Sequence, residues 1–182
     1  MASRRKNGLA PAVGFAPILP QRARILILGT LPSVASLAAQ QYYAHPRNAF
    51  WPILGALLGF EAAAPYESRA AKLRQRGVGL WDVCQSARRP GSLDAAIDHQ
   101  SLRANDIAGL LAGQSSIRAV FFNGASAARL YHKFIVPAPA GRDRQLPHHT
   151  LPSTSPAHAS MNTAQKQQAW SRILEYLTDR EA

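Results

Sequence analysis

Four short segments of the sequence carry side chains suited to holding a planar, hydrogen-bonding molecule. They are Gly-Thr-Leu-Pro-Ser at 29–33, QYYAHPRN at 41–48, Asn123-Gly124, and Pro-Ser-Thr-Ser-Pro at 152–156. Together they offer amides, hydroxyls, aromatic rings and one histidine, while Asp82 is the only acid beside a predicted strand end. Such groups recognise a planar molecule and position water, but they supply no strong general base.

The motifs of common cofactor-dependent enzymes are missing from the sequence. It contains neither GxxxxGK[ST] nor GxGxxG, which argues against a standard phosphate-binding loop and a dinucleotide site of the usual kind. Its single cysteine, Cys84, forms no internal disulfide, and no Cys/His spacing indicates zinc. We therefore expect no cofactor and no metal, and a reducing, intracellular environment.

The charge of the chain points to a polyanionic partner. It carries 21 Lys and Arg against 10 Asp and Glu, a formal net charge of +11. A field of this sign attracts nucleic acid, although a basic protein with a solvated surface is the alternative. Arg88 and Arg89 are accordingly either phosphate contacts or solvated side chains. No apolar run approaches the length of a bilayer span, so we expect no membrane association.

Apolar runs and turn signals predict the elements that position these segments. Apolar runs at 24–28, 78–83 and 118–122, and a weaker one at 148–151, predict strands. Helical spacing and helix-ending signals predict helices at 34–40, 50–58, 66–76, 106–111, 125–134 and from 163 onward. Alternating strands and helices predict an α/β fold, a three-layer α/β/α sandwich with a central, mostly parallel sheet of about four strands.

One domain is expected, with one site at one edge of its sheet. We expect residues 1–21, which are basic and without periodicity, to form a flexible tail rather than a signal peptide, and residues 22–182 to form a single domain. In an open parallel sheet, ligands bind at the carboxyl ends of the strands. Each of the four chemistry-bearing segments follows a predicted strand directly or soon after. All four are therefore expected to meet around a common site.

Five motifs, in consistent order, resemble the uracil-DNA glycosylase superfamily. They are GTLPSVASL, YYAHPRNAFW, LWDVCQSARRPGSLDAAI, FFNGASAA and LPSTSPAHAS, and the similarity extends over residues 24–176. The pattern is most similar to the hypoxanthine-DNA (deoxyinosine) glycosylases, with the mismatch-specific uracil/thymine glycosylases as neighbours. The resemblance implies a monofunctional glycosylase of base-excision repair that flips a deaminated base, hypoxanthine in preference, out of double-stranded DNA and hydrolyses its N-glycosidic bond. It further implies a monomer acting on the nucleoid in bacterial cytoplasm.

The resemblance also assigns roles to residues around the base. Thr30, Leu31, Pro32 and Ser33 correspond to one wall of the base pocket. Most superfamily members carry Asp or Asn at the position of Leu31 to position the attacking water, which a leucine cannot do. This departure agrees with the hypoxanthine branch, in which the Asn of the HPRN motif, here Asn48, takes over that catalytic role.

Other matched residues would contact the flipped base and the duplex. Tyr43 matches the aromatic on which the base stacks, and Asn123 matches the residue that reads its polar edge. The Asn123 amide pairs equally with hypoxanthine or uracil, so the base stays open on residue type alone. His45 is expected beside the substrate, where donation to a backbone carbonyl that stiffens the loop is preferred to a general-acid role. The residues expected to enter the minor groove are Ser153, Thr154, Ser155, Ala157 and His158.

Each single residue also has a purely structural interpretation. Asn48 could cap the helix that follows it, Tyr43 could be a half-buried loop aromatic, and Asn123-Gly124 is a common strand-to-turn signal. Two other functions therefore stay open beside hypoxanthine excision. One is a uracil or thymine glycosylase with the same fold, and the other is a module of another class that binds a DNA lesion without cutting it. A protein that binds a free nucleobase is a third, less favoured interpretation, against which the net charge and the groove-loop motif count.

Overall fold

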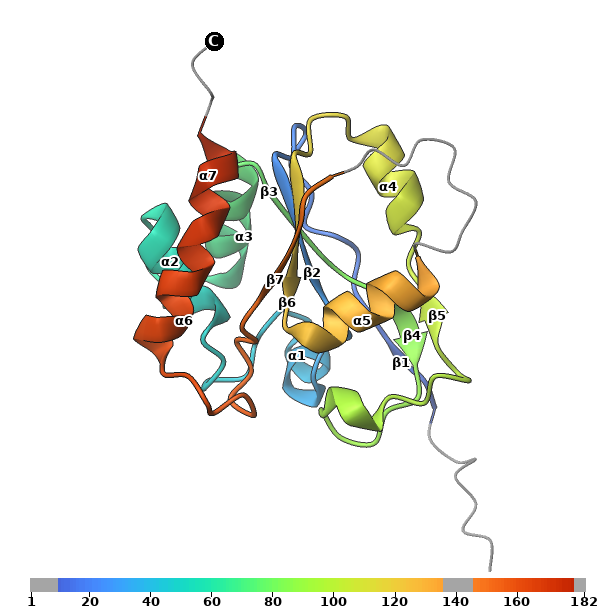
Figure 1. The fold of residues 1–182 in the computed structure, drawn as a ribbon. Coiled ribbons are helices and arrows are strands. Elements are labelled where there is room, and N and C mark those ends of the chain that lie inside the picture. The colour runs from blue at the N-terminus through green and yellow to red at the C-terminus, as the bar shows by residue number, and fades with distance from the viewer. Residues whose placement is uncertain (1–9, 136–145, 179–182) are drawn as a thin grey trace, which may run out of the picture.

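A four-stranded parallel sheet forms the centre of the protein. The structure is a computed structural model that describes residues 10–135 and 146–178. The sheet contains β2 (Ile25–Gly29), β3 (Val78–Asp82), β6 (Ala119–Asn123) and β7 (His148–Leu151), in the order β3-β2-β6-β7. All neighbouring pairs are parallel, so the strands present their carboxyl ends at one edge (Figure 1). The predicted α/β fold with its four-stranded parallel sheet is confirmed.

Helices cover both faces of this sheet, which makes three layers (Figure 1). One face carries α2 (Phe50–Leu58), α3 (Tyr66–Gln75), α6 (Thr163–Trp170) and α7 (Leu174–Leu177), with the turn Ser171–Ile173 between the last two. The other face carries α4 (Ile107–Gly113) and α5 (Ala125–Phe134), and α1 (Val34–Ala39) follows β2 at its carboxyl end. Within the described part of the chain, no helix is long and apolar enough to cross a membrane.

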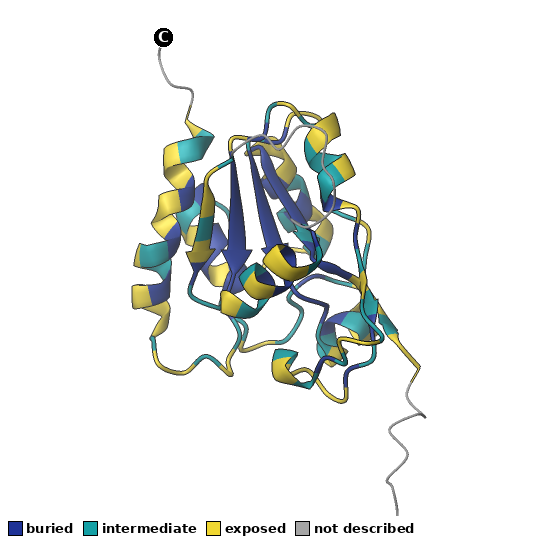
Figure 2. Cartoon of the chain, turned by 45° about the vertical axis from the view of Figure 1, so that its right-hand side comes forward, coloured by how far each residue is buried: buried dark blue, intermediate teal, exposed yellow. Residues whose placement is uncertain are grey.

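Two apolar cores form because successive residues of a strand face opposite sides of the sheet. On β2, Ile25 and Ile27 join the core that packs against α2, α3 and α6, whereas Leu26 and Leu28 join the core that packs against α4 and α5. Figure 2 shows the inner strands β2 and β6 buried along their length. Full burial of such a side chain contributes roughly 1.5–3 kcal/mol, which explains the continuous apolar runs.

A second, smaller sheet lies beside the main one and was not expected from the sequence. β1 (Ala12–Val13), β4 (Cys84–Ala87) and β5 (Arg103–Ala104) pair antiparallel in the order β1-β4-β5. Strands of two to four residues with mixed polarity leave no clear period in the sequence. The segments therefore resemble a tail and a loop until the rest of the fold is in place.

The segment 10–21 belongs to the folded domain, which corrects the flexible tail expected at 1–21. Part of it forms β1, and Ile18, only 4% exposed, packs into a core. The backbone of Ile18 also exchanges two hydrogen bonds with Leu80, at 2.8 and 2.9 Å, along the outer side of the edge strand β3. Residues 1–9 of the expected tail lie outside the described residues.

Hydrogen bonds at the start of α4 correct the predicted N-cap of this helix and connect it to β3. The sequence predicts a helix from Asp106 with Asn105 as its N-cap. Asp106 is the N-cap instead, and its Oδ1 accepts a hydrogen bond from the backbone N–H of Gly109 at 2.8 Å. Asn105 turns inward, and its Nδ2 donates to the backbone oxygen of Asp82 at 2.8 Å. Asn105 thereby ties the start of α4 to the end of β3.

Candidate active site

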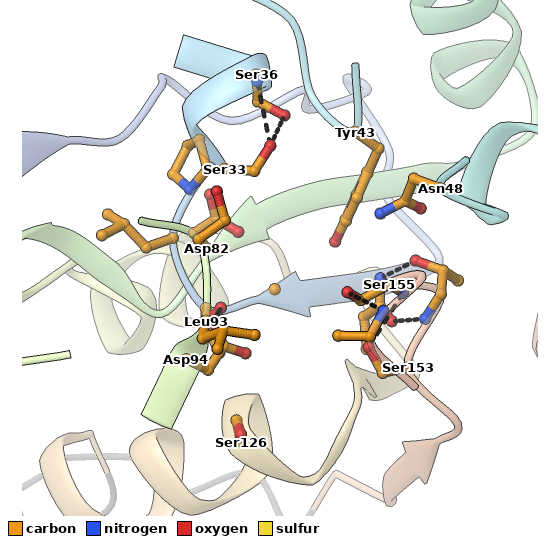
Figure 3. A pocket seen from close by; sticks show the side chains of 18 of the residues that line it. Ser33, Ser36, Tyr43, Asn48, Asp82, Leu93, Asp94, Ser126, Ser153 and Ser155 are labelled. Carbon is orange, nitrogen blue, oxygen red and sulfur yellow. Dashed lines mark hydrogen bonds between the residues drawn. The ribbon is translucent and has the colours of Figure 1, made fainter. Parts of the chain in front are cut away.

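A cavity of about 330 Å³ opens at the carboxyl ends of β2, β3 and β6. Its lining comes from segments far apart in the sequence that the parallel sheet brings to one edge (Figure 3). Of the predicted site residues, the lining contains Thr30, Leu31, Pro32, Ser33, Tyr43, Asn48, Asn123, Ser153, Thr154, Ser155, Ala157 and His158. Residues that the sequence did not single out also line the cavity, among them Ser36, Ser92, Leu93, Asp94 and Ser126.

His45 differs from the other predicted residues, because it is not among those that line the cavity. Its Nδ1 accepts a hydrogen bond from the backbone N–H of Arg47 at 3.1 Å. The ring thus stiffens its own loop, as an acceptor from an amide rather than as the expected donor to a carbonyl. His45 supports the loop that carries Tyr43 and Asn48 into the cavity.

The loop after β2 forms a wall whose polar side chains are already engaged. The hydroxyl of Thr30 donates to Oδ1 of Asp94 at 2.6 Å. Ser33 caps α1, and its Oγ accepts from the backbone N–H of Ser36 at 3.2 Å. Leu31 is 6% exposed and packs into the core beside α5. This wall therefore contributes shape and fixed dipoles, and the side chain at Leu31 has no polar atom with which to hold water.

Asn48 stands at the start of α2 and lines the cavity. Its Oδ1 accepts a hydrogen bond from the backbone N–H of Phe50 at 3.0 Å. Figure 3 shows its amide nitrogen turned toward Tyr43. Ala49, not Asn48, is the N-cap of α2, but the bond to Phe50 still fixes the Asn48 amide at the helix start. One oxygen lone pair and the N–H groups remain for a ligand or water.

Tyr43 reaches the cavity from an uncommon backbone conformation, with φ of +54°. Its ring stacks on Phe50, with 4.0 Å between ring centroids and 21° between ring planes. Burial, followed by the negative charge of Asp82, raises the pKa of the Tyr43 hydroxyl against the opposing effect of the nearby Asn123 side chain, so the hydroxyl stays protonated. The side chain is consequently held in one orientation, in which Figure 3 shows it extending into the site.

Asn123, at the end of β6, is bound to Thr154 through both ends of its amide. Its Nδ2 donates to Oγ1 of Thr154 at 2.8 Å, and its Oδ1 accepts from the backbone N–H of Thr154 at 2.9 Å. The two residues are 8% and 1% exposed, so these hydrogen bonds are shielded from water. The sequence predicts that Asn123 reads the base edge, whereas in the structure it first fixes the 152–158 loop. One N–H and one lone pair of the amide remain.

The 152–158 loop is also held from α6, by residues that the sequence left unassigned. Nε1 of Trp170 donates to the backbone oxygen of Pro152 at 2.9 Å, and Nζ of Lys166 donates to that of Ser155 at 3.3 Å. Lys166 is only 5% exposed. The signal that could have revealed it is its position four residues before Trp170, which puts both side chains on one helix face. The 152–158 loop, which is predicted to enter the minor groove, is therefore anchored to α6.

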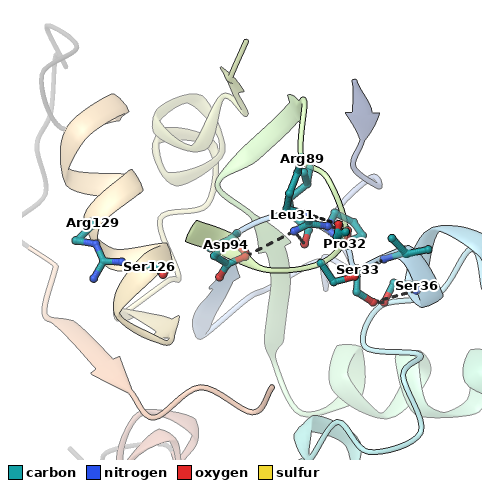
Figure 4. Close-up of polar contacts among 12 residues, drawn as sticks. Leu31, Pro32, Ser33, Ser36, Arg89, Asp94, Ser126 and Arg129 are labelled. Carbon is teal, nitrogen blue, oxygen red and sulfur yellow. Dashed lines mark hydrogen bonds and ion pairs between the residues drawn. The ribbon is translucent and has the colours of Figure 1, made fainter. Parts of the chain in front are cut away.

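A pair of acids lies in the cavity, where the sequence indicated only one. Asp94, from the turn η1 (Asp94–Ala96), joins Asp82 in the lining. Arg89 has a side chain only 2% exposed, lies 3.6 Å from Asp94, and donates to the backbone oxygens of Leu31 and Pro32 (Figure 4). Arg89 is therefore a buried structural cation, and neither the phosphate contact nor the solvated side chain that the sequence allowed.

The two acids have unequal surroundings. Asp82, the last residue of β3, is 4% exposed, and among the described residues its Oδ2 has no hydrogen-bond partner. Burial, together with the charge of Asp94, raises the pKa of Asp82 to about 7, against the opposing effect of Arg89. Burial also raises the pKa of Asp94, although the hydrogen bond from Thr30 and the charge of Arg89 oppose this increase. Asp94 is therefore the stronger acid of the pair, and Asp82 is the one that binds a proton more readily near neutral pH.

Comparison with known sequences agrees with this geometry. The profile of the Uracil DNA glycosylase superfamily matches residues 16–178, which include every segment that lines the cavity. A hypoxanthine DNA glycosylase from Methanosarcina acetivorans is 34% identical over 141 residues, covering 72% of this chain and 88% of the relative. A hypoxanthine DNA glycosylase from Methanosarcina barkeri is 36% identical over 112 residues, covering 61% of this chain and 70% of the relative.

A solved structure shares the fold. The solution NMR structure of a protein from Methanosarcina acetivorans, provisionally described as a uracil DNA glycosylase, aligns with a TM-score of 0.76 and 31% identity. The alignment covers 92% of this chain and 99% of that one. The family resemblance read from the five sequence motifs is thereby confirmed. The chain belongs to the uracil DNA glycosylase superfamily and is a DNA glycosylase.

Proposed function

We propose that this protein removes deaminated bases, hypoxanthine in preference, from double-stranded DNA and leaves an abasic site for base-excision repair. The observation that carries the proposal is the pairing in one cavity of an Asn48 amide with a Leu31 side chain that cannot position water. The two relatives named hypoxanthine DNA glycosylase support a purine as the base. The substrate is then a duplex with a deaminated nucleotide, and no cofactor takes part.

Recognition begins when the damaged nucleotide leaves the base stack. A mispaired base costs less to extrude than a matched one, which selects deamination products at this first step. The extruded base stacks on Tyr43, whose ring is already fixed by Phe50. The remaining N–H and lone pair of Asn123 face the polar edge of the base, with Thr154 keeping the amide in place. These contacts orient the sugar toward Asn48.

Hydrolysis needs a held water molecule rather than a strong base. The glycosidic bond breaks toward an oxocarbenium-like sugar while negative charge moves onto the departing base. Hydrogen bonds to the base strengthen as this charge grows, and this difference between ground state and transition state accelerates the reaction. The Asn48 amide, fixed by its bond to Phe50, orients water toward C1′.

The loop 152–158 is the part that meets the duplex. Ser153, Ser155, Ala157 and His158 enter the minor groove and fill the gap left by the flipped nucleotide. Lys166 and Trp170 anchor this loop to α6, so the loop loses little conformational freedom when it binds DNA. Among the described residues that line the cavity none is lysine. The proposed enzyme is accordingly monofunctional and does not cleave the strand.

The proposal is tested with labelled duplexes that contain inosine, xanthine, uracil or thymine, with alkali to reveal abasic sites. Asn48→Ala removes both the catalytic amide and the helix-start acceptor. We expect it to lower inosine excision by ~10²-fold or more and the free energy of unfolding by about 1 kcal/mol. Asn48→Ser is the matched control, because its hydroxyl still accepts from the Phe50 N–H but does not reach the sugar.

The two variants separate catalysis from capping. Recovery of thermal stability in Asn48→Ser without recovery of excision supports the catalytic role. Recovery of both would reduce Asn48 to a capping residue. Uracil excision by the wild type without inosine excision would overturn the proposed base, and binding without excision of any base would favour a lesion-binding module.

A further inference from the structure

Two buried polar atoms in the cavity have no hydrogen-bond partner among the described residues. They are Oδ2 of Asp82, at the end of β3, and the hydroxyl of Tyr43, in the loop before α2. Both residues line the same cavity. A buried polar atom without a partner destabilises the folded protein, so two such atoms at one ligand site indicate that the ligand supplies the missing partners.

Gly29 provides the space in which these groups meet. It pairs in register with Asp82 across β2 and β3. A Cβ atom at Gly29 would lie 2.8 Å from the hydroxyl of Tyr43, and nearer still to Oδ1 of Asp82 than real contacts allow. Both side chains therefore converge on the position that a larger residue would occupy. The lack of a side chain at Gly29 thus lets the carboxyl of Asp82 and the hydroxyl of Tyr43 approach each other beside the cavity.

Burial, and after it the charge of Asp94, favours the protonated form of Asp82. The titratable groups that face it are Asp94 from η1, Arg89 from the loop after β4, Cys84 from β4, and Tyr42 and Tyr43 from the loop before α2. Burial raises the pKa of Cys84 to about 12 and also raises the pKa of both tyrosines, so these three are neutral at pH 7. Only Asp94 and Arg89 are charged, and they pair with each other.

We propose that Asp82 is a catalytic acid that protonates the departing purine, an assignment that rests on the hypoxanthine glycosylase function proposed above. The carboxyl O–H donates to N7 of the flipped base. As the C1′–N9 bond breaks, its electron pair moves into the base and the proton passes from Asp82 to N7, so the base leaves as neutral hypoxanthine. Water adds to C1′ and releases its second proton to solvent, from which the Asp82 carboxylate is protonated again.

This assignment gives the cavity a reason to prefer a purine. A purine keeps a basic ring nitrogen, N7, after the bond to N9 has broken. Uracil has no corresponding imidazole nitrogen and leaves as an anion that only hydrogen bonds stabilise. An acid in the cavity therefore lowers the barrier for hypoxanthine more than for uracil, because its effect is confined to the transition state of the purine.

The experiment measures single-turnover excision of inosine from duplex DNA between pH 5 and 9, for the full-length protein. We expect the wild-type rate to fall about tenfold per pH unit above pH ~7. A duplex with 2′-deoxy-7-deazainosine, in which C–H replaces N7, is expected to react ~10²–10³-fold more slowly. Neither measurement needs a variant, so the test holds whether or not substitutions fold.

Substitutions identify the acid. Asp82→Asn has the same shape but no transferable proton, and we expect the low-pH rate to fall ~10²–10³-fold and to lose its alkaline decline. Its rate on the 7-deaza substrate should then match its rate on inosine. Asp94→Asn removes the like charge that raises the pKa of Asp82, so the decline should begin at lower pH. Duplex binding and thermal stability are measured for each variant.

Three results would overturn the assignment while leaving the proposed function intact. They are a wild-type rate that does not decline with pH, rapid excision of the 7-deaza base, and an Asp82→Asn rate within threefold of wild type. Absence of inosine excision by the wild type at every pH would overturn the proposed function and this inference together. The two failures are thus distinguishable from one set of assays.

Discussion

The two sides of the cavity are built from different chemistry. We call Tyr43, Asn48, Asn123 and Thr154 the amide side, and Thr30, Asp82, Arg89 and Asp94 the acid side. On the amide side, the polar atoms that do the holding are neutral and hydrogen-bonded, as in the two bonds between Asn123 and Thr154. On the acid side, an ion pair between the buried Arg89 and the partly exposed Asp94 lies beside a carboxyl oxygen of Asp82 that has no partner among the described residues.

This difference indicates that one side positions the base and the water, whereas the other side exchanges a proton. The two buried hydrogen bonds between Asn123 and Thr154 fix the position of the amide, so the amide side holds its geometry while the base moves. An unpaired carboxyl with a pKa raised to about 7 changes its proton content within the physiological range. The amide side therefore places the base and the water, and the acid side responds to the departing charge.

The largest effect is expected from Gly29→Ala, which disturbs both sides at once. The new methyl group displaces the Asp82 carboxyl and the Tyr43 hydroxyl from the point where they meet. We expect ~10²-fold or greater loss of inosine excision, and destabilisation of about 1–3 kcal/mol from overpacking. Gly113→Ala is the matched control, because a Cβ there meets nothing within 4 Å, and it should leave excision unchanged. Unimpaired Gly29→Ala would mean that the two groups do not act at a common point.

Asp82→Asn is expected to affect only the acid side and to change stability in the opposite direction. The pKa of Asp82 is raised to about 7 in the folded protein, above its value of about 4 in the unfolded chain. Between these values the folded state keeps a proton that the unfolded state has lost, so the free energy of unfolding falls as pH rises from ~4 to ~7. Asparagine does not ionise, so the variant does not undergo this fall in the free energy of unfolding. We expect Asp82→Asn to be more stable than wild type at pH 8, by on the order of 2–4 kcal/mol.

Urea unfolding of both proteins at pH 4.5 and pH 8 measures that difference. The two proteins should be nearly equally stable at the lower pH and separate at the higher one. A gain in stability accompanied by a loss of excision would mark Asp82 as a functional group. A stability difference that is the same at both pH values would contradict the raised pKa.

The smallest effect is expected on the amide side, from Thr154→Val. Valine keeps the shape of threonine but leaves Nδ2 of Asn123 without its acceptor, which should cost about 1–2 kcal/mol. Excision should fall about tenfold, since a loop displaced by a fraction of an ångström misplaces the sugar. Thr154→Ser restores the acceptor and should recover both values in thermal melts and single-turnover assays. A pH profile changed by Thr154→Val would break the division of roles between the two sides.

The sequence predicts the central sheet and α5 closely, because buried parallel strands and a long amphipathic helix leave strong periodic signals. The run at 148–151 and the helix at 125–134 coincide with β7 and α5. It also predicts the amide side, because Tyr43, Asn48 and Asn123 lie in motifs or directly after a strand. All three line the cavity.

The acid side could not be predicted in the same way. Asp94 reaches Thr30 across 64 residues from a short turn, and no local pattern encodes such a contact. Arg89 stands beside Pro90-Gly91, a composition typical of an exposed loop, yet it is buried against Asp94 and two carbonyls. Its placement depends on β4 pairing with β1 and β5, whose few residues carry no readable period.

The two hydrogen bonds between Ile18 and Leu80 have a consequence for the solubility of the protein. Strand β3 is at an end of the main sheet, where unpaired backbone groups would recruit strands from other molecules. Ile18, in the segment before residue 22, pairs with the N–H and C=O of Leu80 in the middle of this edge and so hinders the pairing of another strand there. A shortened protein that began at residue 22 would keep every residue of the cavity but expose unpaired backbone groups of β3. The segment before residue 22 therefore contributes to solubility rather than to the site.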